Sequence, residues 1–296
     1  MKDPKKPIYN KLVFSAIILA LILLMQPLEI LFFIKDIDVL FPSGIIALKE
    51  RNLLIFIQLL MLLIIIPVYI FTFAFSWWYR ADNKEAKYDP HLVDHKIAEI
   101  AWWGVPLILT AIVAFITYVK THELDPYKPI SAGKKPIHIE VVALQWKWLF
   151  IYPEEQIATV NQLKFPSNTP IQFDITADAP MNSFWIPKLG GQIYAMPGMK
   201  TTLHLIANEE GTFRGSSANI SGKGFAGMTF ETEATSEESY EEWVQSIKDS
   251  SKTLNLEEYK TLAAPSENNP VELFQLQEEN LFHEIIMKYM KPPSKP

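Results

Sequence analysis

The stretch from Gly215 to Met228 reads Gly-Ser-Ser-Ala-Asn-Ile-Ser-Gly-Lys-Gly-Phe-Ala-Gly-Met and is rich in residues typical of a tight loop. Its serines and its asparagine can satisfy backbone groups in a tight loop. The stretch contains no cysteine and no histidine, so Met228 is its one soft metal donor. We therefore expect a structured loop that holds no redox metal.

Composition limits what the rest of the chain can do. The chain has 296 residues, of which 49% are hydrophobic, and a formal net charge of −6 with no cysteine. This length allows one medium soluble domain plus membrane segments. The absence of cysteine excludes disulfides, thiolate metal sites, a cysteine nucleophile and a lipidated N-terminal cysteine. The acidic balance argues against nucleic acid as a partner.

Two segments are long and apolar enough to cross a bilayer. Leu53 to Ser76 carries no charge over 24 residues, and Ile100 to Val119 supplies 20 more; at ~1.5 Å per residue these are about 36 Å and 30 Å of helix. We predict a transmembrane hairpin within residues 35–119, with spans at about 53–79 and 100–119. Tryptophans at one end of each span fit an aromatic belt at one membrane face; they are Trp77, Trp78, Trp102 and Trp103. The alternative is a pair of buried core helices.

Residues 1–34 leave two possibilities open. Several lysines precede the apolar run Leu12 to Met25, which resembles a signal peptide, but no small-residue cleavage site follows. The segment is either a cleaved signal or an uncleaved anchor that adds a third transmembrane helix. Both place Lys35 to Asn52 outside, Arg80 to Glu99 in the cytoplasm and the C-terminal domain on the outer side.

The exported part divides by composition. Residues 120–135 are rich in Pro, Lys and Gly and indicate a linker. Residues 136–234 contain short strand-like runs separated by turn signals, which predicts an antiparallel sandwich or barrel. The predicted strands are Ile137 to Leu144, Trp146 to Tyr152, Ile171 to Ala177, Phe184 to Pro187, Thr201 to Ala207 and Phe225 to Glu233. Residues 235–296 indicate a helical extension, with a capping box at Thr235 and Glu238 and helices near 235–247, 256–264 and 278–290.

Several tracts together resemble subunit II of haem-copper oxidases. They are Pro136 to Trp148, Met181 to Gly190, Gln192 to Gly198 and Gly215 to Met228. Lys147 and the tract Leu262 to Glu267 are similar to the quinol-oxidising, cytochrome bo-type branch of that family. The resemblance implies a membrane-anchored all-β protein: two or three transmembrane helices, a cupredoxin-like β-sandwich and a short helical C-terminal extension.

The resemblance also implies where copper ligands would fall. The family's histidines fall on Asn182 and Phe225, its bridging cysteines on Ser217 and Ser221, its carbonyl donor on Asn219 and its methionine on Met228. Hydroxyls are hard, neutral donors and a phenyl ring has no lone pair, so we expect these positions to be vestigial and to bind no metal. We expect packing instead, with Phe225 filling the vacated volume. Trp146 and Trp148 are interpreted as core and interface residues.

Glu99 is a candidate on other grounds. It lies at the cytoplasmic start of the second span, where the family has a glutamate at the mouth of a proton-uptake channel. A carboxylate at the membrane border can collect protons. The alternative is a solvated carboxylate that is favoured by the helix dipole. His91 and His95 have a spacing that could hold a metal on a helix, but a solvated pair is favoured.

The predicted function is that of a non-copper subunit II in a terminal quinol oxidase, which oxidises quinol, reduces oxygen to water and pumps protons in aerobic respiration. The chain would give structural support and take up protons, without a catalytic residue or cofactor of its own. Haems, catalytic copper and the quinol pocket are expected in subunit I, with further small membrane subunits and lipid as partners, in a bacterial plasma (inner) membrane. The alternatives are an electron-entry subunit II of cytochrome c oxidase and a membrane-anchored cupredoxin-like binding protein.

Overall fold

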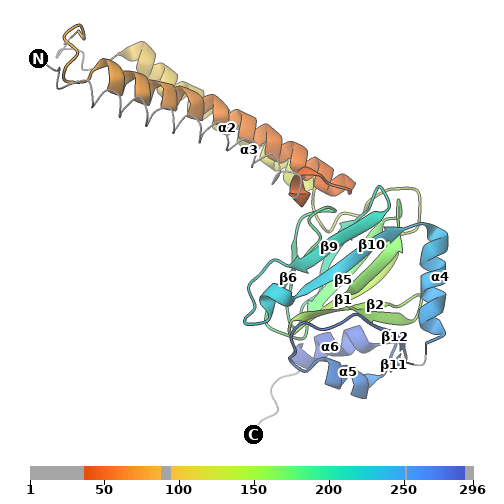
Figure 1. Ribbon diagram of the computed structural model, residues 1–296. Coiled ribbons are helices and arrows are strands. Elements are labelled where there is room, and N and C mark those ends of the chain that lie inside the picture. The colour runs from red at the N-terminus through yellow and green to blue at the C-terminus, as the bar shows by residue number, and fades with distance from the viewer. Residues whose placement is uncertain (1–36, 88–94, 251, 291–296) are drawn as a thin grey trace, which may run out of the picture.

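The computed structural model describes residues 37–87, 95–250 and 252–290 (Figure 1). The predicted signal or anchor at residues 1–34, and His91, lie outside the described residues. The hairpin and linker are followed by a β-domain and by an extension that adds both strands and helices. In chain order the elements are η1 (Asp38–Leu40), α2 (Ile45–Trp78), α3 (Lys96–Glu123), β1 (Ile137–Leu144), β2 (Lys147–Tyr152), β3 (Ile157–Val160), β4 (Gln162–Pro166), β5 (Ile171–Ala177), β6 (Asn182–Trp185), β7 (Ile193–Ala195), β8 (Thr201–Leu205), β9 (Gly211–Ser217), η2 (Phe225–Gly227), β10 (Thr229–Thr235), α4 (Glu237–Lys248), β11 (Thr253–Leu254), α5 (Leu256–Leu262), β12 (Glu272–Leu276) and α6 (Leu281–Met290).

Helices α2 and α3 form a hairpin that projects away from the β-domain (Figure 1). They contain 34 and 28 residues, longer than the predicted spans, because α2 contains polar residues near its β-domain end and α3 continues through polar residues at both ends. In the most apolar 18-residue window of each helix, no residue is buried inside the protein. The core helices of a soluble domain would be mostly buried. Lys49 of α2 and Glu123 of α3 form an ion pair of 2.9 Å near the ends of these helices at the β-domain.

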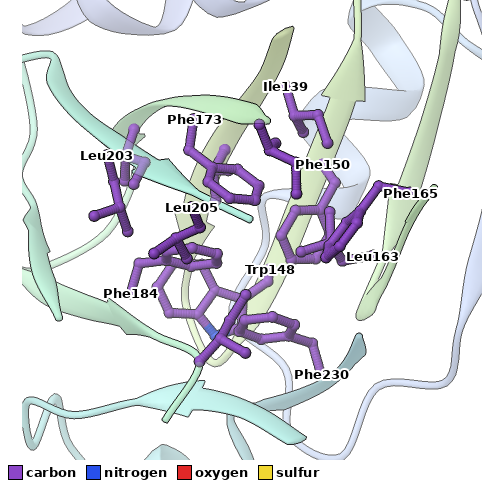
Figure 2. Packing of buried hydrophobic residues seen from close by; sticks show 14 of the residues in the cluster. Ile139, Trp148, Phe150, Leu163, Phe165, Phe173, Phe184, Leu203, Leu205 and Phe230 are labelled. Atoms are coloured by element: carbon purple, nitrogen blue, oxygen red, sulfur yellow. The ribbon is translucent and has the colours of Figure 1, made fainter. Parts of the chain in front are cut away.

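The β-domain is a two-sheet sandwich. One sheet has the order β11-β12-β3-β2-β1-β5-β8 and the other has the order β4-β10-β9-β6-β7. Aromatic side chains from both sheets fill the space between them, with Trp148, Phe150 and Phe173 facing Phe184 and Phe230 (Figure 2). The Phe184 and Phe230 rings stack with their centroids 5.2 Å apart. These contacts fix the two sheets face to face.

The C-terminal extension is more than helical. β12 pairs antiparallel with β3 and thereby lengthens the large sheet, which the sequence did not predict. Helices α5 and α6 cover the other face of that sheet, over Val142, Leu144, Leu149 and Ile151. The N-cap of α4 is Ser236, whose hydroxyl accepts the Ser239 N–H at 3.2 Å, so the predicted cap at Thr235 is wrong by one residue.

The start of α2 is seated on the β-domain. The backbone N–H groups of Ser43 and Gly44 both donate to the Lys188 carbonyl, at 2.8 and 3.0 Å, and Ala47 N–H donates to Leu189 at 3.2 Å. A Cβ atom on Gly44 would lie 2.7 Å from the Leu189 carbonyl oxygen, so only glycine allows this approach. The hairpin is therefore joined to the sandwich by backbone contacts as well as by the linker.

A buried carboxylate fastens the extension. Asp178 follows β5, and its side chain is 2% exposed. It accepts hydrogen bonds from Tyr259 of α5 at 2.7 Å, from Lys288 of α6 at 2.7 Å and from the Tyr289 hydroxyl. Burial acts to raise the pKa of Asp178, but the bonds from Lys288, Tyr289 and Tyr259 outweigh it and lower that pKa.

We predict that Asp178→Ala lowers the free energy of unfolding by about 3 kcal/mol, because two hydroxyls and an ammonium lose their acceptor. The exposed Glu258→Gln on α5 is the control and should change little. Since the folded pKa is depressed, the contribution of Asp178 is present above the ordinary aspartate pKa of about 3.9 and is lost as the pH falls below it. Denaturant unfolding at pH 7 and pH 3 measures both effects. If Asp178→Ala lost the same free energy of unfolding at pH 7 and at pH 3, the stabilising role of the ionised Asp178 carboxylate would be contradicted.

Candidate functional site

The stretch 215–228 connects β9 to β10 beside β6 (Figure 1). Ser217 ends β9, and Met228 lies between η2 and β10. β6 begins at Asn182 and pairs with β9 so that Phe184 lies opposite Ser217. This pairing brings Asn182 beside the loop, although it is 35 residues away from Ser217 in the chain.

Hydrogen bonds join three of the six vestigial positions. The Ser217 hydroxyl lies 2.8 Å from Asn182 Oδ1 and 3.2 Å from the Asn219 carbonyl oxygen. Asn182 Nδ2 donates to the Pro180 carbonyl at 2.8 Å, and Asn219 Nδ2 donates to the Met181 carbonyl at 3.1 Å. Ser and Asn therefore satisfy one another and the neighbouring backbone, as the sequence predicted.

The other three positions differ in their surroundings. Met228 is fully buried in the main core, and its carbonyl accepts the Ser217 N–H at 3.1 Å. Phe225 is only partly buried, so the expectation that it fills the vacated volume is not met. The interior is filled by Trp148, Phe184 and the other core aromatics (Figure 2). Ser221 Oγ is buried without a hydrogen-bond partner among the described residues.

This set of donors does not fit a binuclear copper centre. Such a centre requires thiolate and imidazole ligands, whereas these positions offer neutral hydroxyls, amides, a phenyl ring and one thioether. Within residues 37–87, 95–250 and 252–290, no group of three or more His, Cys, Asp or Glu side chains could hold a metal ion. The residues at these six positions can shape the loop, but they cannot carry electrons through copper.

Trp146 covers the loop from the β1–β2 turn. Its backbone has a φ of +66°, which is uncommon for a bulky residue. Its indole N–H donates to the Ser221 carbonyl at 3.3 Å. A Cβ atom on Gly224 would collide with the indole ring, and one on Gly222 would lie 3.3 Å from it. The tryptophan therefore packs directly on the glycines of the vestigial loop.

The C-terminal extension supports the loop from the outside. The ammonium of Lys147, a side chain that is almost fully buried, donates to the Ala264 carbonyl at 3.1 Å and to the Ser266 hydroxyl. Burial lowers the pKa of Lys147. Nearby, Lys223 of the loop forms an ion pair of 3.0 Å with Glu267 of the extension. Sequence reasoning noted Lys147 as a mark of the quinol branch but missed this role, because both partners of its ammonium lie more than 110 residues away.

Glu99 lies apart from this loop. It is an exposed residue in the first turn of α3, at the end of that helix away from the β-domain (Figure 1). The 28 residues of α3 span about 42 Å. His95 is the N-cap of the helix, and its ring accepts the Ala98 N–H at 3.3 Å. Glu99 and the vestigial copper positions therefore form two separate sites.

We predict that Lys147→Met, which keeps the volume of the side chain but removes its ammonium, loosens residues 263–269. Two hydrogen bonds from a charged donor are lost, and we expect a loss of about 2 kcal/mol in local stability. Hydrogen exchange of the backbone amides of residues 263–269 should be faster in Lys147→Met than in the wild-type protein. The control Lys135→Met removes an exposed ion pair with Glu154 and should not change these amides. Unchanged exchange of these amides in Lys147→Met would contradict the claim that the Lys147 ammonium holds this part of the extension in place.

Comparison with known proteins places the chain in a family. Residues 151–235 match the family described as "Cytochrome C oxidase subunit II, periplasmic domain", and residues 248–293 match "COX Aromatic Rich Motif". The chain is 52% identical over 248 residues to "Cytochrome bo(3) ubiquinol oxidase subunit 2" of Pseudomonas putida, covering 84% of this chain and 79% of that protein.

More distant relatives agree with this assignment. "Ubiquinol oxidase subunit 2" of Acetobacter aceti is 49% identical over 256 residues, which are 86% of this chain and 83% of that protein. "Quinol oxidase subunit 2" of Bacillus anthracis is 38% identical over 244 residues, which are 81% of this chain and 84% of that protein. These relatives favour the quinol branch over the cytochrome c oxidase alternative. The chain belongs to the family of ubiquinol oxidase subunit 2, the quinol-oxidising branch of the subunit II proteins.

Proposed function

We propose that the chain is the non-copper subunit II of a proton-pumping terminal quinol oxidase in aerobic respiration. One observation carries this proposal: the chain is 52% identical to a ubiquinol oxidase subunit 2. It has Ser217, Ser221 and Phe225 at positions where the resemblance implies copper ligands. Electron entry through this chain would need a redox metal, which those side chains do not hold. Electrons from quinol therefore reach the catalytic subunit without passing through this domain.

The proposed partners follow from the surface of the hairpin. Large apolar side chains are exposed along α2 and α3, from Leu54 to Trp78 and from Ile97 to Val119. In a membrane such surfaces pack against lipid or against other transmembrane helices. We assign part of this surface to a haem-bearing subunit I, which would also hold the catalytic copper and the quinol, and part to further small membrane subunits.

The proposed location is a bacterial plasma (inner) membrane. The chain is a membrane-anchored subunit with two span-like helices and a domain of the periplasmic type. In this orientation the β-domain lies on the outer side, and the turn between α2 and α3 lies in the cytoplasm. Residues 120–135 act as the linker between these parts, and residues 1–34 are a cleaved signal or an anchor.

Purification of the complex tests this proposal against a membrane-anchored binding protein. Affinity purification of the full chain in mild detergent should recover a haem-bearing partner that oxidises quinol with uptake of oxygen. Recovery of the chain alone, without haem, would favour the binding protein. A signal from a binuclear copper site in the purified chain would instead favour an electron-entry subunit.

Glu99 is the proposed proton-uptake residue. It is an exposed carboxylate at the cytoplasmic start of α3, next to the apolar span, and no ion pair involves it among the described residues. A carboxylate in such a position can take up a proton from the cytoplasm and pass it to groups in a neighbouring membrane subunit. The position supports this role, and only the intact complex can test it.

We predict that Glu99→Ala slows proton-coupled oxygen reduction on the order of tenfold, because proton delivery becomes limiting, while assembly and haem content are retained. Glu85→Ala, an exposed carboxylate on the same side of the membrane, is the matched control and should keep wild-type turnover. Oxygen uptake by the purified complex measures both variants. Wild-type turnover in Glu99→Ala would contradict the proposal that Glu99 takes up protons for the complex.

A further inference from the structure

A cavity of 360 Å³ lies where the hairpin meets the β-domain. Its walls come from the first turns of α2, from residues 123–131 after α3, from Gly191 and Gln192, and from β8. This volume is within the range of small-ligand sites. The vestigial copper positions and Glu99 are not among the lining residues, so the cavity is separate from both sites.

The cavity lies at the depth of lipid headgroups. Glu50 is three residues before Leu53, where the uncharged stretch of α2 begins, and it is therefore about 4.5 Å outside the apolar part of the helix. On α3 the apolar stretch ends at Val119, and the polar run Lys120 to Glu123 follows, with Asp125 two residues further on. Both α2 and α3 thus change from apolar to polar residues beside the cavity, as helices do at the border of the hydrocarbon layer.

Glu50 is a carboxylate without a cation. Its Oε1 accepts the Gly191 N–H at 3.1 Å, which orients the group in the cavity wall. No ion pair involves Glu50 among the described residues. Glu123, in the same cavity, is instead neutralised by Lys49 at 2.9 Å and by Lys120. The fixed and partly buried Glu50 is therefore a ready acceptor for an ammonium group.

The rest of the lining complements a charged and partly apolar ligand. Ile45 and Ile46 supply apolar surface, and Ser131 and Gln192 supply polar groups. Lys128, an exposed lysine on the rim, forms no ion pair in the part of the chain that the structure describes. Among the described residues, the cavity therefore offers two carboxylates without an ion pair, the partly buried Glu50 and the exposed Asp125, and one such ammonium, Lys128, beside apolar side chains.

We propose that this cavity binds the headgroup of a phospholipid with a primary ammonium, such as phosphatidylethanolamine. The ammonium group donates to Glu50, and the phosphate pairs with Lys128. Such a zwitterion supplies a cation to Glu50 and an anion to Lys128 at once, whereas a lysine from a partner subunit would supply no anion for Lys128. The proposal rests on the membrane anchoring of the chain and not on its role in quinol oxidation.

Native mass spectrometry of the full chain in its complex tests the site. The complex is placed in nanodiscs of phosphatidylethanolamine, phosphatidylcholine or phosphatidylglycerol, and retained lipid is counted. We expect retention of phosphatidylethanolamine over phosphatidylcholine, whose headgroup has no N–H donor. Glu50→Gln should weaken this retention about tenfold, as expected for the loss of a charge-assisted hydrogen bond. Glu210→Gln, an exposed carboxylate beyond β8, is the matched control.

A second measurement identifies the occupant directly. A carbodiimide couples a carboxylate to a neighbouring amine, so peptide mapping should find phosphatidylethanolamine joined to Glu50. Coupling of Glu50 to a lysine of a partner subunit would overturn the proposal, as would equal retention of the three lipids in wild type and Glu50→Gln. A complex that keeps the lipid but oxidises no quinol would contradict the proposed function and leave this site standing.

Discussion

A hydrogen bond of 2.8 Å between the Ser217 hydroxyl and Asn182 closes the loop end of the sandwich. It joins two of the six positions at which the resemblance to haem-copper oxidase subunit II implies copper ligands. A neutral hydrogen bond contributes about 1 kcal/mol, while a structural metal contributes on the order of 10 kcal/mol. A loop held by such hydrogen bonds is therefore stabilised further by contacts with other parts of the chain.

The structure provides this support from two sides. Trp146 lies over Gly222 and Gly224 from the β1–β2 turn, and the extension reaches the loop through Lys147 and through the pair of Lys223 with Glu267. The extension is fixed in turn by β12 on the large sheet and by its bonds to the carboxylate that follows β5. Burial and polar contacts thus hold the loop in place.

Sequence patterns predicted some elements well and missed others for physical reasons. The bounds of β1 and β5 agree with the prediction, because both runs are rich in β-branched residues and are bounded by prolines or turn residues. β9 was missed because its glycines and serines have low strand propensity, and its pairing with β10 decides its conformation. The six copper-ligand positions were proposed from the motifs and stay a prediction. The support from Lys147 and the cavity beside Glu50 could not be predicted, because they depend on contacts distant in sequence.

Copper analysis of the full chain, purified alone from membranes and incubated with copper, tests the central claim most directly. We expect no tightly bound copper after dialysis and no near-infrared band of a binuclear thiolate centre, since the loop is closed by oxygen and nitrogen groups that already bond to one another. Two tightly held copper atoms per chain would contradict the account.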